Sequence, residues 1–187
     1  MPFEDRCRSM IIREEGSISH MYLDTRGFVT VAVGQLLPTV ESAQKLDFIH
    51  RDTGVPADAA EIALDYQTVR LQPTGKIASF YKPFTKLDLP EHEIVALLNQ
   101  RIGEFEADLR TDFPDFDNFP EAAKLGLMDM VFNLGNSGLV NKFPIFTKAA
   151  QAQNWAVCAL ECQRRGISAE RNAMTKSFFE EASTAQS

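Results

Sequence analysis

The sequence of 187 residues has few of the features that mark whole classes of protein. Its three cysteines are an odd number without regular spacing, which excludes a scaffold built on disulfides. No apolar run reaches the roughly 18 residues of a membrane-spanning helix, and the start MPFEDRCRSM is too charged for a signal peptide. We therefore expect a chain that is synthesised in the cytoplasm without a signal peptide and does not insert stably into membranes.

Positive charge and catalytic motifs are also scarce. The 19 Lys and Arg residues against 26 Asp and Glu give a net charge of −7, so we expect no nucleic-acid partner. The three histidines lie in no H-E-x-x-H pattern and no G-x-S-x-G is present, so the sequence predicts neither metal nor serine-histidine catalysis. A zinc site at Cys158 and Cys162 is a minor alternative, because these residues lack histidine partners.

Helical and strand-like patterns are segregated along the chain. Residues 2–15 carry apolar residues at helical spacing and stop at Gly16. Residues 20–36 switch to aromatic and β-branched residues around Gly27, which is typical of a hairpin. The order predicts an α+β fold with separate parts. The other predicted segments are helices over 38–54, 55–72, 89–113, 121–134, 143–166 and 168–182, and a loop or short strand over 73–87.

Two carboxylates and a hydroxyl occur close together near the start. Glu15 ends the predicted helix, where the negative end of the helix dipole disfavours an ionised carboxylate, and partial burial would strengthen this effect. A carboxyl group that keeps its proton is suited to general acid catalysis. Singly, Asp24 is a common turn residue and Thr30 an ordinary strand residue. Together they offer the two carboxylates in different environments that glycoside hydrolysis requires.

The spacing of these residues resembles that of the phage-type (T-even-like) lysozymes of glycoside hydrolase family 24. The family pattern reads E-G, then Y-x-D, then G-x-x-T-x-G-x-G-H, and this sequence keeps its eight residues between Glu and Asp and its five between Asp and Thr. The segments MDMVFNLGNSG and GISAERNAM resemble the family's cleft-lining helix end and its arginine-bearing segment. The sequence departs from the pattern at Ala32 and Gln35, at an expected modest cost.

The resemblance implies one lysozyme-like domain over 1–187. It has a small N-terminal β-hairpin lobe and a larger helical C-terminal lobe, joined by a long helix, with a cleft between the lobes. The helix 1–15 packs on the helical lobe, and the small lobe spans 16–87 with an inserted segment at about 56–87. Residues 88–187 form the linking helix and the helical lobe.

The activity implied by the resemblance is that of an N-acetylmuramidase. Such an enzyme cleaves the β-1,4 bond between N-acetylmuramic acid and N-acetylglucosamine in peptidoglycan, with inversion and without a cofactor or a metal. Glu15 would be the general acid, Asp24 the base that activates water, and Thr30 the residue that holds this water. The neighbouring Glu14 would be a solvated helix charge. The resemblance also implies substrate-binding residues Leu36, Phe132 and Asn133 and a supporting Arg171 that pairs with Glu15.

The partner implied by the resemblance is the glycan strand of peptidoglycan, bound by a monomer that acts on the cell wall. The protein would reach the wall as an endolysin released by a holin, or as an antibacterial effector delivered by a secretion system. An effector would require an immunity or inhibitor protein. The alternative is a catalytically weak or inactive module of the lysozyme fold that binds the wall or an inhibitor.

Overall fold

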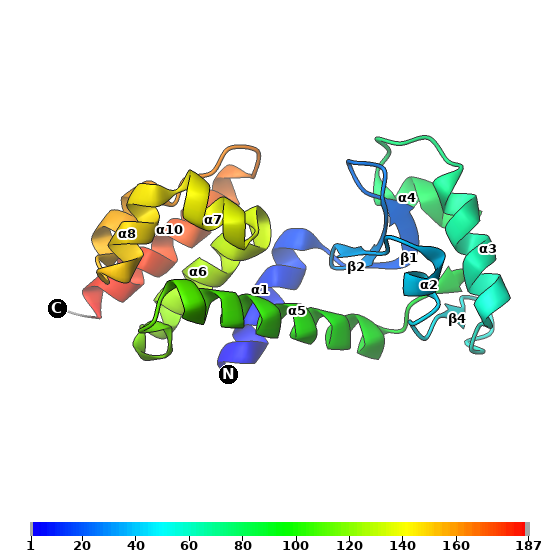
Figure 1. The fold of residues 1–187 in the computed structure, drawn as a ribbon, viewed down its shortest axis with the longest axis horizontal. Helices are drawn as coiled ribbons and strands as arrows, with labels where there is room; N and C mark the ends of the chain where they lie inside the picture. The colour runs from blue at the N-terminus through cyan, green and yellow to red at the C-terminus, as the bar shows by residue number, and fades with distance from the viewer. Residues whose placement is uncertain (1, 186–187) are drawn as a thin grey trace. The chain divides into compact units, whose positions relative to one another are not determined.

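The computed structural model describes residues 2–185 and shows a mixed α+β protein that is mostly helical (Figure 1). This confirms the expected α+β class at the coarse level. The chain separates into two compact units, Met1–Glu14 with Arg101–Ser187 and Glu15–Gln100. We name them the terminal unit and the central unit. Among residues 2–185, none of the helices combines the length and apolar character needed to cross a membrane.

Two small antiparallel sheets form part of the central unit. Strands β1 (Ile18–Leu23), β2 (Val29–Ala32) and β3 (Gln35–Leu36) pair in chain order, which confirms the hairpin predicted over 20–36. The second sheet pairs β4 (Ile49–His50) with β5 (Leu87–Asp88). The buried side chains of β1 and β2 belong to one apolar core with residues of the helices described next.

Three helices of the central unit are short or sharply bounded. Helix α3 (Ala59–Arg70) begins at a capping box in which Asp58 and Glu61 bond each other's backbone N–H groups. Helix α2 (Val40–Ala43) lasts one turn, so the helix predicted over 38–54 is wrong beyond it. The physical reason is the pairing of β4 with β5, which outweighs local helix preference. Helix α4 (Ala78–Tyr81) and a 3₁₀ turn (Lys82–Phe84) replace part of the predicted 73–87 loop.

The terminal unit is helical. Helix α6 (Glu121–Leu134) has the predicted bounds, whereas the predicted 143–166 segment forms two helices, broken around Gln153 at a positive φ of 54°. Its aromatic core includes Trp155, whose ring centroid lies 4.8 Å from that of Phe119 and 6.3 Å from that of Phe179. The other helices with residues in this unit are α1 (Phe3–Glu15), α5 (Glu91–Asp112), α7 (Asn136–Lys142), α8 (Pro144–Gln151), α9 (Trp155–Glu161) and α10 (Ala169–Thr184).

The long helix predicted over 89–113 is confirmed as α5. Its residues up to Gln100 belong to the central unit and those from Arg101 to the terminal unit. The predicted apolar stripe is buried at Ile94, Leu98 and Leu109. The division therefore lies inside this helix, whereas the sequence analysis placed the start of the linking segment at residue 88.

Candidate functional site

The turn after β1 holds the side chain of Asp24 by its own backbone. Asp24 Oδ1 accepts hydrogen bonds from the N–H groups of Arg26 at 2.9 Å and Phe28 at 2.8 Å. The backbone closes the same turn, since Asp24 N–H donates to Phe28 O and Gly27 N–H donates to Asp24 O. Gly27 has a φ of +83°, which favours glycine. One carboxylate oxygen of Asp24 is therefore fixed by the turn.

The second oxygen of Asp24 is less constrained. Its ionic contact is with Arg26, whose Nε lies 3.7 Å away, which is longer than a hydrogen bond. The Asp24 side chain is 24% exposed, so it is not sealed in the core. The arrangement suits a carboxylate that must be held in place while it accepts a proton from water.

Thr30 is bonded to the same peptide segment as Asp24. Its hydroxyl is buried and donates to Phe28 O at 3.1 Å. Phe28 thus donates through its N–H to Asp24 and accepts through its carbonyl from Thr30. Because the hydroxyl proton is engaged, the Thr30 oxygen retains lone pairs that can accept a hydrogen bond from water. The structure therefore brings together two of the predicted site residues.

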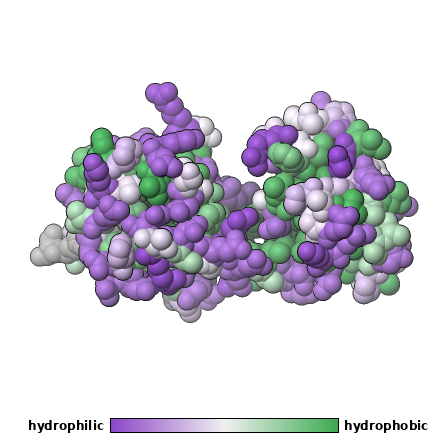
Figure 2. Space-filling model, in the orientation of Figure 1, coloured by the Kyte–Doolittle hydropathy of each residue, from purple (hydrophilic) through white to green (hydrophobic). Residues whose placement is uncertain are grey.

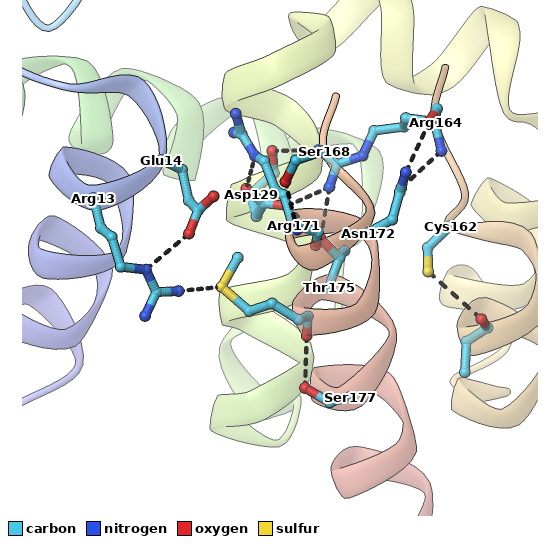
Figure 3. Close-up of polar contacts among 12 residues, drawn as sticks. Arg13, Glu14, Asp129, Cys162, Arg164, Ser168, Arg171, Asn172, Thr175 and Ser177 are labelled. Carbon is cyan, nitrogen blue, oxygen red and sulfur yellow. Dashed lines mark hydrogen bonds and ion pairs between the residues drawn. The ribbon is translucent and has the colours of Figure 1, made fainter. Parts of the chain in front are cut away.

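Glu15 and Glu14 differ from the expectation. Glu15 ends α1 and is exposed, so the partial burial considered for it is not found. Glu14 was expected to be the solvated charge, but this prediction is wrong, because its side chain is only 17% exposed. The Arg13 guanidinium pairs with it, with Nε 2.8 Å from Glu14 Oε1, and also contacts the sulfur of Met174 (Figure 3).

Tyr22 is a further residue of this site. It is the tyrosine of the Y-x-D pattern, to which the resemblance assigns no role. Its phenol is half-buried, and its pKa is raised first by this burial and then by the charges of Asp24 and Glu15. The phenol consequently keeps its proton and can donate a hydrogen bond. Tyr22 also stands opposite Thr30 in the sheet. The signal that could have identified it is the two-residue spacing of the Y-x-D motif, which puts Tyr22 near the end of β1 and Asp24 directly after this strand.

The departures from the resemblance pattern lie next to this site. Ala32 adopts a positive φ of 56°, a conformation that costs a residue with a Cβ about 1–2 kcal/mol. This explains physically why glycine suits the position. Gln35 donates through Nε2 to Leu36 O at 3.2 Å. The predicted lining residue Leu36 is half-buried and pairs with Thr30 in the sheet.

The other predicted site residues belong to the terminal unit. Phe132 and Asn133 are half-buried near the end of α6, and the Phe132 ring packs edge-on against Phe105 with centroids 4.9 Å apart. Arg171 is buried in α10, where its Nε donates to Asp129 Oδ1 at 2.8 Å. The structure therefore places Asp129, which sequence analysis missed, as a partner of Arg171. The pairing of Arg171 with Glu15 stays a prediction.

Asp129 is the centre of a buried polar network (Figure 3). Besides Arg171, it receives hydrogen bonds from Arg164 and from the Thr175 hydroxyl. The Ser168 hydroxyl accepts from Arg171 N–H at 3.0 Å and caps α10. The sequence signal for this network was a single acidic residue in the middle of the apolar helix predicted over 121–134.

The cysteines are free and buried. Burial raises the pKa values of Cys7 and Cys158 to about 12. Cys158 Sγ lies 3.9 Å from Phe146 O, and Cys162 Sγ lies 3.5 Å from Ala159 O. Within residues 2–185, the structure contains no group of three or more His, Cys, Asp or Glu residues that could hold a metal ion.

No protein-family model matches this chain, and no curated protein matches it either. A function therefore has to be inferred from the residues themselves. One ordered polar arrangement outside the buried network is the unit formed by Asp24, Phe28 and Thr30, with Tyr22 beside it.

Proposed function

We propose that the protein is a peptidoglycan hydrolase of the lysozyme type, an N-acetylmuramidase that works by acid-base catalysis. The observation that carries the proposal is the fixing of Asp24 and Thr30 on the two polar groups of Phe28. This leaves a carboxylate oxygen in the turn and a hydroxyl oxygen in the adjoining strand β2 as acceptors. Two acceptors of this kind can hold one water molecule and remove a proton from it.

The proposed reaction needs a proton donor as well as a base. Asp24 Oδ2 takes a proton from the water held by Thr30, and the water oxygen forms a bond to the anomeric carbon. Glu15 gives its proton to the glycosidic oxygen as the bond to that carbon breaks. Each carboxyl group thus changes its protonation state once, and no cofactor takes part in the step.

Tyr22 supports this assignment because both carboxylates act on its phenol. The charges of Asp24 and Glu15 each contribute to its raised pKa, after burial. A neutral phenol is able to donate a hydrogen bond to an ionised carboxylate without adding a negative charge. Glu15 and Asp24 are therefore assigned to one reaction, although they lie on different sides of β1 in the sequence.

A second function is favoured by two other observations. Glu15 is exposed, and Asp24 Oδ1 is saturated by two backbone N–H groups in the manner of an ordinary turn residue. Both are expected of a module that binds the wall or an inhibitor without cleaving glycan. In that case the same turn is a recognition surface, and neither carboxylate transfers a proton.

The experiment that separates these functions measures new reducing ends released from purified peptidoglycan between about pH 5 and 8. The wild-type protein should release them, and Glu15→Gln and Asp24→Asn should lower the rate at least about a hundredfold, because each lacks a proton-transfer group. Asparagine keeps the oxygen that accepts the turn hydrogen bonds, so the fold of Asp24→Asn should persist.

The matched control is Glu14→Gln, which makes the same change one residue earlier in α1. It should retain most of the activity. A loss in Glu14→Gln with activity preserved in Glu15→Gln would reassign the acid to Glu14, the more covered of the two. Binding to intact walls without any reducing ends would establish the binding module instead.

The cellular setting proposed for the enzyme is the bacterial wall, reached as an endolysin or as a secreted antibacterial effector. If it is an effector, an inhibitor protein would be its second partner. Co-expression of such an inhibitor should suppress the release of reducing ends in the same assay.

A further inference from the structure

The turn that holds Asp24 touches a second loop of the central unit. Residues 24–28 and 73–77 meet at Gly27, where an added Cβ would lie 3.1 Å from Thr74 Cγ2. Figure 1 shows the β1–β2 turn and the loop before α4 at the same end of this unit. We name these two segments together the ledge.

The loop of the ledge is tied down at both ends. Its first residue, Pro73, accepts a hydrogen bond at 2.8 Å from the hydroxyl of the fully buried Tyr81. Just beyond its last residue, Ala78 O lies 2.9 Å from Nε2 of the buried His20 on β1. Residues 73–77 are therefore held in a defined place beside the Asp24 turn, rather than only tethered to it by the chain.

Two cations of the ledge rest on aromatic rings. The Arg26 side chain is 71% exposed, and its Cζ lies 5.3 Å from the centroid of the Phe28 ring. Lys76 is exposed, with Nζ 5.8 Å from the centroid of the Phe80 ring. An aromatic face orients a cation without neutralising it, so both charges stay available to a ligand.

The charge of the ledge is opposite in sign to that of the whole protein. Asp24, Arg26 and Lys76 sum to −1 + 1 + 1 = +1, whereas the chain carries −7. Other arginines are closely paired, as Arg51 is with Asp88 at 3.0 Å. The distance of 3.7 Å between Arg26 Nε and Asp24 Oδ2 is longer, so Arg26 is less closely paired than Arg51.

Large apolar side chains accompany these cations. Phe28 is 47% exposed and Ile77 is 77% exposed. On the face shown in Figure 2, hydrophobic residues interrupt the hydrophilic surface of the central unit. Exposed apolar groups beside exposed cations are suited to a ligand that has both apolar faces and carboxylates.

We propose that the ledge binds the carboxylates of the peptide stems that substitute peptidoglycan, with Lys76 as the main contact. This inference rests on the proposed function, because it places the stems beside the turn that carries Asp24. It also gives part of the inserted segment a role, as a determinant of specificity for glycan with attached acidic peptides.

The test compares two substrates, intact peptidoglycan and the same glycan strands with the peptide stems removed. Lys76→Gln should raise KM for intact peptidoglycan about two- to fivefold without changing kcat, since an exposed charge pair contributes this much. On stripped strands, neither constant should change. The difference in KM for intact peptidoglycan between wild type and Lys76→Gln should shrink as the salt concentration increases, because salt screens exposed charges.

The matched control is Lys45→Gln, which removes an exposed lysine that lies outside the ledge in the same unit. It should leave KM unchanged on both substrates. Equal KM values for wild type and Lys76→Gln on intact peptidoglycan would overturn the inference, as would an equal increase of KM on stripped strands.

A binding measurement keeps the inference separate from catalysis. In the Glu15→Gln background, sedimentation with insoluble peptidoglycan should show weaker binding of Lys76→Gln by the same two- to fivefold. If the wild-type protein cleaves neither substrate, the proposed activity fails while this measurement still decides about the ledge. Equal binding of the two proteins rejects the inference whatever the outcome for catalysis.

Discussion

The two units differ in the partners of their buried ionisable residues. In the central unit, the buried residues His20 and Asp65 each bond to backbone atoms of a nearby segment. In the terminal unit, Asp129 and Arg164 bond side chain to side chain, together with Arg171 and Thr175. The first arrangement fastens one segment to another at single points. The second joins helices α6 and α10 and the segment between α9 and α10 through shared charges.

This difference has a consequence for sensitivity to mutation. A network of buried charges fails as a whole when one member is removed, because the remaining charges stay desolvated. The loss of an isolated hydrogen bond to the backbone affects only that bond, so it lowers the free energy of unfolding by less. We therefore expect the terminal unit to be vulnerable to the loss of charge and the central unit to respond more to pH.

The largest effect is expected from Asp129→Asn. The change keeps the shape of the side chain but leaves the buried guanidinium groups of Arg164 and Arg171 without their carboxylate, at a cost of about 3–5 kcal/mol. The free energy of unfolding from urea titration measures this loss. The control Asp117→Asn removes an acid that is 68% exposed and paired with Arg110, and should cost less than about 1 kcal/mol. Similar losses in both variants would remove the contrast between buried and surface charges.

An intermediate effect is expected from Gly126→Ala in α6. The new Cβ would lie 2.6 Å from Cζ of Phe179, whose fully buried ring cannot move aside, so overpacking should cost about 1–3 kcal/mol. Gly103→Ala in α5 is the matched control, because nothing lies within 4 Å of its added Cβ. It should stabilise the protein by about 0.5–1 kcal/mol through helix propensity. A higher free energy of unfolding in both variants would mean that the Phe179 ring can shift to accommodate the added Cβ.

The smallest effect is a pH dependence assigned to His20. Burial is the main cause that lowers its pKa, while its hydrogen bond to Ala78 O acts in the opposite direction. Above the unfolded pKa of about 6.5 the imidazole is neutral in both states, and its contribution to stability is complete. As the pH falls below 6.5, the unfolded chain binds a proton that the folded chain binds less well, so stability is lost. The loss approaches at most about 1.4 kcal/mol per pH unit.

The measurement compares wild type and His20→Gln in urea titrations between about pH 7.5 and 5. The variant should lose stability less steeply as the pH falls. His92→Gln is the control, because His92 has a side chain that is 78% exposed. The raised pKa of Asp65 contributes equally to all three proteins. Parallel curves for wild type and His20→Gln would contradict the assignment.

Much of the fold could be predicted from the sequence because its periodicity is local. The hairpin around Gly27 and the helix over 121–134 follow from alternation and helical spacing, and both are found. The helix predicted over 38–54 fails because Ile49 pairs with Asp88, a partner far along the chain. No pattern within 38–54 contains that information.

The candidate site was predictable to a similar extent. The turn chemistry of Asp24 follows from the short segment DTRGF, and the Asp24 hydrogen bonds conform to it. The relative exposure of Glu14 and Glu15 could not be derived, because Arg13, which pairs with Glu14, also contacts the distant Met174. Asp129 likewise has its partners more than 30 residues away in the sequence.

The division of the terminal unit between two stretches of chain sets an order of events during synthesis. Helix α1 leaves the ribosome before the central unit, yet the rest of its own unit begins only at Arg101. The central unit can therefore close first, while Cys7, Met10 and Ile11 of α1 still lack the surface that will bury them. At translation rates of roughly 5–20 residues per second, α1 remains without its packing partners for a time on the order of ten seconds. The nascent chain thus passes through a stage in which a folded core carries a helix whose apolar face, with Cys7, Met10 and Ile11, is open to chaperones.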